Sequence, residues 1–310
     1  MGSALRLALY GEPEAECAAA AWLRVSQEFE RAEQAMSRFR DSSDLARLNQ
    51  AAGLGQPRVV DRRVVRALVA ARRAQRVTDG RFDGRVLKDL ERLADEGTGR
   101  DPGTLRSFEP SREWLIADPR RSTVLLDGPI DLGGIGKGLA LRWAWRALRG
   151  SQSRAFARGS GALLEAGGDL VAGGRAPDGS DWRVGIEDPS DEPGRDRLPR
   201  LIAVVSLGRG AAAATSSVAV NRWRTRDGRL VHHLIDPRTG EPGGDGLLAV
   251  TVVGDDPAWA EVWSKTLFLA GRMGIATLAR ARALAAWWVH EDGRLEMTPA
   301  ARQRTLWTIG

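Results

Sequence analysis

Apolar and polar positions in the first half of the chain follow two periods, one typical of helices and one of strands. Between Pro13 and Arg38, apolar side chains recur at steps of three and four residues, which places them on one face of a helix. Asp61 is placed to cap a second helix that ends near Val77, and Val86–Ala94 predicts a third, shorter one. Short apolar runs predict strands at residues 4–10, 59–60, 114–116 and 122–126.

The second half of the chain is richer in strand patterns and ends with two helices, expected at Pro257–Leu269 and Ile275–Leu284. A hairpin is expected over residues 221–235, with its turn at Asp227-Gly228. Further strands are expected at residues 162–170, where a strand meets a double glycine, and at 182–186, 201–207, 247–253, 285–289 and 294–297.

Two polar segments interrupt this pattern. Residues 95–110 are rich in Gly and Pro and are expected to form a surface loop, and residues 188–200 are interpreted as a hairpin tip or a disordered insert. Strands and helices do not alternate as they do in repeated βαβ units. We therefore expect an α+β fold, with mixed or antiparallel sheets and helices packed on them, in one domain over residues 1–310.

A glycine-rich turn over residues 131–140 leads from a strand into a helix and carries one lysine, Lys137. Glycines let the backbone approach a ligand closely, and a helix start offers unpaired N–H groups and a positive dipole end. The combination predicts an anion site, most often for phosphate. Gly138 follows the lysine where a Walker P-loop has Ser or Thr. A tight strand-to-helix turn with a solvated lysine fits the same pattern equally well.

Other candidates stand beside glycines or turns. Phe39 lies at a polar turn before a short helix that Ser42 or Ser43 would cap, where its ring is either a core anchor or a face for a planar ligand. Asp83, Asp131 and Asp169 each lie within two residues of a glycine, so each either binds a ligand hydroxyl or caps a turn.

His233 is the main titratable candidate, because the chain has only three histidines, and it lies close to Asp236 at the end of a strand. A histidine there can act as a general base or bind a phosphate. His232 and His233 face opposite sides of a strand, so only one of them can point into a site. A structural histidine at a turn is the alternative.

Composition narrows the function classes. The net charge is +6, but acidic residues interleave with the basic ones, so we expect no nucleic-acid role. No run of 18 apolar residues and no signal peptide is visible, which leads us to expect a cytoplasmic protein without a membrane segment. One cysteine excludes a disulfide framework. Arginine outnumbers the three lysines heavily, so each lysine hints that a compact ammonium is needed.

Taken together, the motifs occur in a recognisable order. Two are specific, DLGGIGKG at residues 131–138 and HLIDPRTG at residues 233–240. The weaker ones are Met1-Gly2-Ser3, residues 37–49, Gly80-Arg81-Phe82-Asp83, Gly167-Gly168-Asp169 and Ala214-Thr215-Ser216. This order resembles the ApbE-type FAD:protein FMN transferases over nearly the whole chain.

The resemblance implies a single domain related to the T-fold that binds FAD. It also implies a Mg²⁺-dependent reaction, in which a threonine hydroxyl of a target protein attacks the flavin-side phosphate and AMP leaves. Some relatives instead hydrolyse FAD to FMN and AMP. Catalytic roles would fall to His233 and Asp236. The residues expected to bind FAD are Met1, Phe39, Arg81, Phe82, Asp83, Gly133, Lys137, Leu139 and Ile235.

The chain differs from the family's sequence pattern at the positions that would bind the metal ion. The family's helical motif is Ala-Asp, three residues, then Thr, and here the two ligand positions hold Glu261 and Lys265. A backbone carbonyl near Gly136 would be a third ligand. An ammonium repels a divalent cation, so one interpretation places Lys265 where the metal would be, facing the pyrophosphate. In the other, Glu261 and Lys265 pair at i,i+4 and the metal binds through Ser264 or Thr266.

Overall fold

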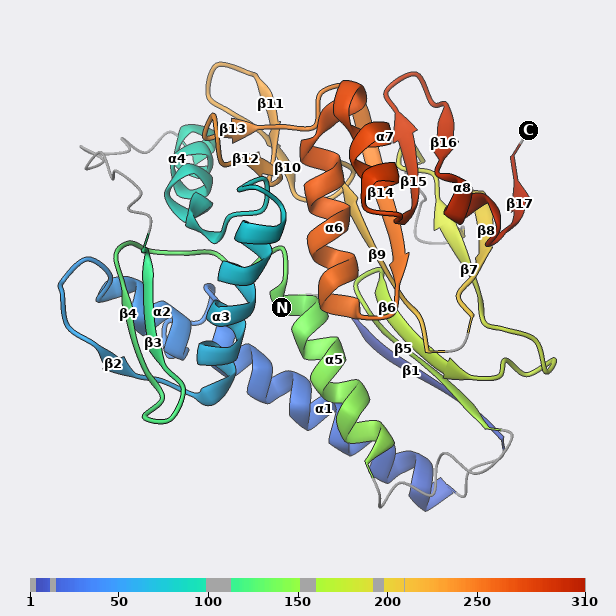
Figure 1. Cartoon of the computed structure of the whole chain (residues 1–310), viewed down its shortest axis with the longest axis horizontal. Helices are drawn as coiled ribbons and strands as arrows, with labels where there is room; N and C mark the ends of the chain where they lie inside the picture. The colour runs from blue at the N-terminus through green and yellow to red at the C-terminus, as the bar shows by residue number, and fades with distance from the viewer. Residues whose placement is uncertain are drawn as a thin grey trace. The chain divides into compact units, whose positions relative to one another are not determined.

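A computed structural model describes residues 4–11, 15–98, 113–150, 160–191, 198–208 and 210–309 (Figure 1). The chain divides into two compact units. Unit 1 contains Glu30–Gly136 and Val220–Gly243, and unit 2 contains Gly2–Phe29, Lys137–Ala219 and Gly244–Gly310. Among the described residues, none of the helices combines the length and the apolar character that crossing a membrane requires.

Unit 2 is built on a seven-stranded sheet in which every pair of neighbours is antiparallel. In sheet order its strands are β1 (Leu5–Tyr10), β5 (Gly161–Ala166), β6 (Asp169–Gly174), β9 (Ala212–Ser217), β14 (Leu247–Gly254), β15 (Ala285–His290) and β16 (Leu295–Met297).

Strands β5 and β6 form a two-residue hairpin that pairs Ala166 with Asp169. Gly167 and Gly168 both have positive φ, at 55° and 86°, which suits the turn that joins twisted antiparallel strands. The sequence predicts one strand meeting this double glycine. The return strand β6, which begins at Asp169, is a finding of the structure.

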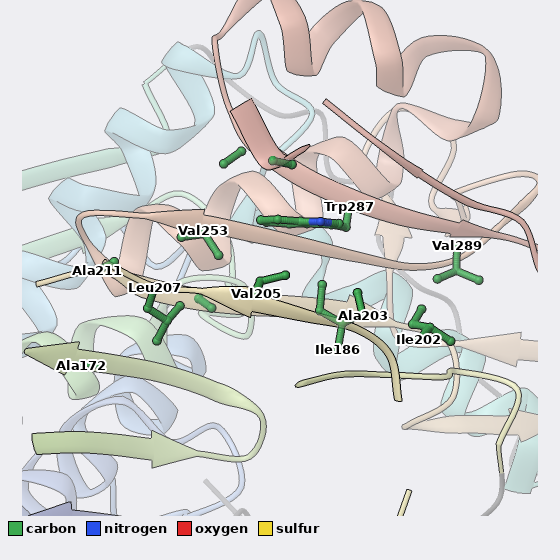
Figure 2. Close-up of a cluster of buried hydrophobic side chains, with 13 residues drawn as sticks. Ala172, Ile186, Ile202, Ala203, Val205, Leu207, Ala211, Val253, Trp287 and Val289 are labelled. Atoms are coloured by element: carbon green, nitrogen blue, oxygen red, sulfur yellow. The ribbon is translucent and has the colours of Figure 1, made fainter. Parts of the chain in front are cut away.

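The two faces of the large sheet are covered differently. A three-stranded antiparallel sheet, β17 (Thr305–Thr308), β8 (Leu201–Ser206) and β7 (Arg183–Glu187), packs on one face. Figure 2 shows this core, where side chains of β8 such as Val205 lie with Val253 and Trp287 of the large sheet. The sequence does not predict β17 or the short helix α8 (Pro299–Arg302).

Helices cover the other face. Residues of α1 (Ala15–Met36) and α5 (Gly136–Arg149), including Val25 and Leu141, pack with Leu164 and Val171 of the sheet. Helix α6 (Pro257–Leu269) packs on β9 and β14, and α7 (Gly271–Ala281) follows it. The positions of α1 and α6 agree with the helical periods in the sequence.

Unit 1 combines short helices and small sheets. Its helices are α2 (Asp44–Gln50), α3 (Arg62–Val77), the 3-10 turn η1 (Gly84–Val86) and α4 (Leu87–Thr98). Its strands are β2 (Arg58–Val59), β4 (Thr123–Leu126) and β3 (Leu115–Asp118) in one sheet, and the hairpins β10–β11 (Arg222–Arg224, Leu230–His232) and β12–β13 (Ile235–Asp236, Glu241–Pro242). The predicted caps are confirmed, because Ser43 caps α2 and Asp61 caps α3.

Helix α4 runs further than the sequence indicates. Residues 95–98, expected to begin a loop, continue the helix, and residues 99–110 of that expected loop lie outside the described residues. Val86, Leu90 and Leu93 pack against Val231 and Ile235, which attaches the helix to the hairpins that carry the histidine motif. The α+β class is confirmed, and a single domain over residues 1–310 stays a prediction.

Candidate functional site

The predicted site residues fall into two groups, one in each unit. In unit 2 the central residue is Lys137 in the first turn of α5. Its Nζ lies 3.0 Å from Oδ2 of Asp169 and donates to the carbonyl of Gly167 at 3.2 Å. Asp169 is 2% exposed, and its Oδ1 accepts the N–H of Thr215 at 3.1 Å. The β5–β6 turn therefore holds the lysine through a carboxylate and a carbonyl.

Burial and the neighbouring charges act on both partners of this pair. Burial raises the pKa of Asp169, although the charge of Lys137 opposes the shift. For Lys137 burial works toward a lower pKa, but the carboxylates of Asp169 and Glu261 outweigh it and the pKa is raised. The ammonium therefore stays charged across the physiological pH range.

Glu261 of α6 reaches the start of α5. Its Oε2 accepts the N–H of Gly138 at 2.7 Å, so a carboxyl group of one helix caps the N-terminus of another. The helices approach closely there, because a Cβ on Gly138 would lie 2.5 Å from Cα of Ala258 and from the carbonyl oxygen of Pro257. Burial and the charge of Asp169 raise the pKa of Glu261 to about 8.

The next turn of α6 carries the other predicted metal positions. Lys265 is 5% exposed, and its charge acts on Glu261 by lowering the pKa of that carboxyl. Ser264 donates its hydroxyl to the carbonyl of Glu261 at 3.0 Å and shares a 2.9 Å hydrogen bond with the hydroxyl of Ser216. Thr266 donates to the carbonyl of Val262 at 2.7 Å and is fully buried.

The glycine-rich turn belongs to unit 1 up to Gly136. Asp131 organises it, because Oδ2 accepts the N–H of Gly133 at 3.1 Å and Oδ1 lies 3.1 Å from Nε of Arg38. The backbone N–H of Asp131 donates to the carbonyl of Gly84 at 2.7 Å, which joins this turn to the Phe82–Asp83 loop. Sequence reasoning missed the Arg38–Asp131 pair, for which no local pattern exists.

The aromatic candidates of unit 1 differ in exposure. Phe39 is 78% exposed, so the core-anchor interpretation is wrong and its ring is open to a planar ligand. The Arg38 guanidinium lies 4.2 Å from the centre of that ring and steadies it. Phe82 is only 2% exposed, and its N–H donates to Thr78 Oγ1 at 3.0 Å, so its side chain is part of the core.

Asp83 has several protein partners. Its carboxylate accepts the side chain of Arg85 at 2.7 Å and the amide of Gln75 at 2.7 Å, and it caps η1 through the N–H of Arg85. The turn-capping interpretation of Asp83 is therefore confirmed. A contact between Asp83 and a ligand stays a prediction.

The histidine motif lies on the hairpins beside α4. His232 accepts the N–H of Leu234 on Nδ1 at 3.2 Å, and burial lowers its pKa, so it is a neutral structural histidine. His233 lies one residue past the strand, and its backbone N–H donates to the carbonyl of Asn221 at 3.2 Å. Its catalytic role stays a prediction.

Asp236 is held by Arg238, whose guanidinium donates to both carboxylate oxygens at 2.5–3.2 Å. Burial favours a higher pKa, but the bonds from Arg238 and the charge of Arg81 outweigh it, so the pKa of Asp236 lies below its usual range. Ile235 beside it is fully buried, as is Leu139 in the first turn of α5. Met1 lies outside the described residues.

A model of one protein family matches residues 1–288, which is most of the chain. The chain belongs to the ApbE family. Among curated proteins it is 28% identical to a FAD:protein FMN transferase of Klebsiella pneumoniae, over 98% of this chain and 91% of that protein. It is 26% identical to the FAD:protein FMN transferase of Escherichia coli K12, over 87% of this chain and 76% of that protein.

Solved ApbE structures share the fold. The ApbE protein of Thermotoga maritima superposes with a TM-score of 0.78 at 25% identity, covering 98% of this chain and 96% of that one. The flavin transferase ApbE of Vibrio cholerae superposes with a TM-score of 0.75 at 22% identity, over the same shares of the two chains. The family resemblance that the motifs indicate is thereby confirmed.

The magnesium ion implied for the ApbE family does not fit the donors found here. Among the described residues, no three His, Cys, Asp or Glu side chains are grouped so that they could hold a metal ion. One oxygen of Glu261 caps α5, and the hydroxyls of Ser264 and Thr266 donate to helix carbonyls. Lys265 brings a positive charge to the same face of α6.

Proposed function

We propose that this chain is a FAD:protein FMN transferase, which moves FMN from FAD to a threonine hydroxyl of a target protein and releases AMP. The observation that carries the proposal is the family match over residues 1–288, together with relatives of that name that are aligned over most of their own length. The identity of the acceptor and a cytoplasmic location stay predictions.

The charges at the start of α5 suit the FAD pyrophosphate. Lys137 is charged and fixed by Asp169, and a helix N-terminus attracts an anion. In the proposed reaction the threonine oxygen bonds to the flavin-side phosphorus, the bond from that phosphorus to the bridging oxygen breaks, and the bridging oxygen leaves with AMP. We assign the proton of the threonine hydroxyl to His233.

The other predicted residues are assigned to binding and orienting FAD. Asp236 stays ionised at neutral pH, because Arg238 and Arg81 hold its pKa low, and we assign it to balancing positive charge rather than to taking a proton. The exposed ring of Phe39 offers a stacking face for the flavin or the adenine. No step is assigned to a metal ion, since the donors do not fit one.

The deciding experiment incubates the protein with FAD and an acceptor domain that contains a single accessible threonine. Transfer predicts that the acceptor gains the mass of one FMN phosphoester and that an equal amount of AMP appears. The matched control is the same acceptor with that threonine replaced by valine, which must gain nothing. A variant with His233→Asn should lose transfer and keep FAD binding.

Three other outcomes of this experiment would refute the transferase proposal. Equal amounts of FMN and AMP without any acceptor modification would make the protein an FAD pyrophosphatase. Bound FAD with neither product would make it a flavin carrier or regulatory homologue. Failure to bind FAD under any condition would remove the basis of the site assignment.

A further inference from the structure

Four ionisable side chains meet where α5 begins, the half-buried Lys137 and the buried Asp169, Glu261 and Lys265. Lys137 pairs with Asp169 at 3.0 Å, and Glu261 reaches the same helix start through Gly138. Lys265 follows Glu261 by one helical turn, so both project from one face of α6, and each feels the charge of the other. The cluster therefore contains two ammonium groups and two carboxyl groups, all from unit 2.

Three of the four carboxyl oxygens of this cluster already have partners in the protein. Both carboxylate oxygens of Asp169 are engaged, one by Lys137 and one by the N–H of Thr215. Oε2 of Glu261 accepts the N–H of Gly138, and the hydroxyl of Ser264 lies between Ser216 and a helix carbonyl. A magnesium ion is usually held by one or two protein carboxylates together with waters and substrate phosphates, and here the carboxyl groups are already paired with Lys137 and with the N–H groups of Gly138 and Thr215.

The charge of Lys265 also opposes the binding of a metal ion. An ammonium is a compact cation that donates hydrogen bonds and accepts none. Placed one turn from Glu261 and more than nine-tenths buried, it opposes a second cation at that carboxylate with little screening by solvent. The same charge attracts an anion bound at the adjoining helix start.

We propose that Lys265 provides, as a built-in charge, the neutralisation that a divalent cation would otherwise supply, so that this chain binds the pyrophosphate of FAD without a metal ion. The inference rests on the proposed function for the identity of the anion. Lys265 is a positioning residue, because its charge acts through the cluster and its side chain is buried.

The test measures cation binding and FAD binding separately. Mn²⁺ is titrated into the full chain and followed by electron paramagnetic resonance, without FAD and then with it. FAD affinity is measured by flavin fluorescence in excess EDTA and in excess Mg²⁺. We expect no stoichiometric Mn²⁺ site in either titration and FAD affinities that agree within about twofold, a difference worth about 0.4 kcal/mol.

Two variants sharpen the test. Glu261→Asp with Lys265→Thr places a carboxylate and a hydroxyl one turn apart without the ammonium, and we expect it to gain one Mn²⁺ per chain and an FAD affinity that rises at least about tenfold on adding Mg²⁺. Lys265→Thr alone should weaken FAD binding in EDTA by about tenfold. The matched control Lys88→Thr removes another of the three lysines, from α4, and should change neither quantity.

The proposal is overturned if the unaltered chain binds one Mn²⁺ tightly, or if EDTA abolishes its FAD binding. The unaltered chain alone decides this, so a misfolded double variant does not leave the matter open. If no FAD binds in EDTA or in Mg²⁺, the proposed function fails. The Mn²⁺ titration then still reports whether the cluster excludes a divalent cation.

Discussion

Gly138 lies where α5 approaches α6 so closely that a side chain has no room. In Gly138→Ala the new Cβ would lie 2.5 Å from both Cα of Ala258 and the carbonyl oxygen of Pro257. These are backbone atoms, so no rotamer change relieves the overlap and the two helix starts must separate. Overpacking of this kind costs about 1–3 kcal/mol.

Separation of the helices also lengthens the hydrogen bond from Gly138 to Glu261, which is 2.7 Å long and buried. Leaving a buried polar group without its hydrogen-bond partner costs about 1–3 kcal/mol, and the better helix propensity of alanine returns up to about 1 kcal/mol. We therefore expect Gly138→Ala to lower the free energy of unfolding by about 2–4 kcal/mol.

Gly136→Ala is the matched control, two residues earlier on the same helix. There a Cβ would meet Leu132 Cβ at 3.5 Å, which is ordinary contact, so we expect unchanged or slightly higher stability. Urea denaturation followed by tryptophan fluorescence and circular dichroism measures the stability of both variants, and in a thermal melt Gly138→Ala should unfold about 3–6 °C lower. If the two variants unfold within about 0.5 kcal/mol of each other, the close approach of α5 and α6 is wrong.

Three further predictions test single features. Phe39→Ala should weaken FAD binding by about three- to tenfold, as expected for loss of one stacking ring. It should leave the melting temperature unchanged, because the ring is exposed, and a lower melting temperature would contradict this prediction. Folding raises the pKa of Glu261 from 4.5 to about 8, so between these pH values the folded state binds a proton that the unfolded state has released. The free energy of unfolding should therefore decrease as the pH rises from about 4.5 to 8. Urea titrations at several pH values should show that Glu261→Gln flattens this dependence. The lowered pKa of Asp236 has the opposite sign, so its stabilisation should disappear as the pH falls below about 4, and Asp236→Asn should be less sensitive to acid unfolding than the unaltered chain.

Elements with strong local signals could be predicted from the sequence. Helix α3 has a capping Asp61 and regular apolar spacing, and α6 begins with a proline in its first turn after Asp256. The sequence does not predict strand β6, because Gly167-Gly168 resembles the end of a strand and only the backbone angles reveal a hairpin turn. The polar composition of residues 95–98 predicts a loop, yet these residues continue α4.

The site was less predictable because its contacts join distant residues. Gly138 and Glu261 are 123 positions apart, and nothing local to either residue indicates that a glutamate of one helix caps the other. The same holds for Lys137 and Asp169, which meet only because a hairpin turn places Asp169 at the start of β6. Motif order could indicate which residues matter, but the partner of each charge depends on tertiary packing.

The pairing of charges within the protein affects ligand binding at the glycine-rich turn. Its lysine and glycines predict an open anion site, yet in the folded chain Lys137 is held by Asp169 and the N–H of Gly138 is capped by Glu261. An anion arriving there competes with two carboxyl groups for charges that are already oriented. The competition costs affinity, but the ammonium loses little conformational entropy on binding, because it is fixed beforehand. Since neighbouring carboxylates raise the pKa of Lys137, its own titration should contribute no pH dependence to anion binding between about pH 6 and 9.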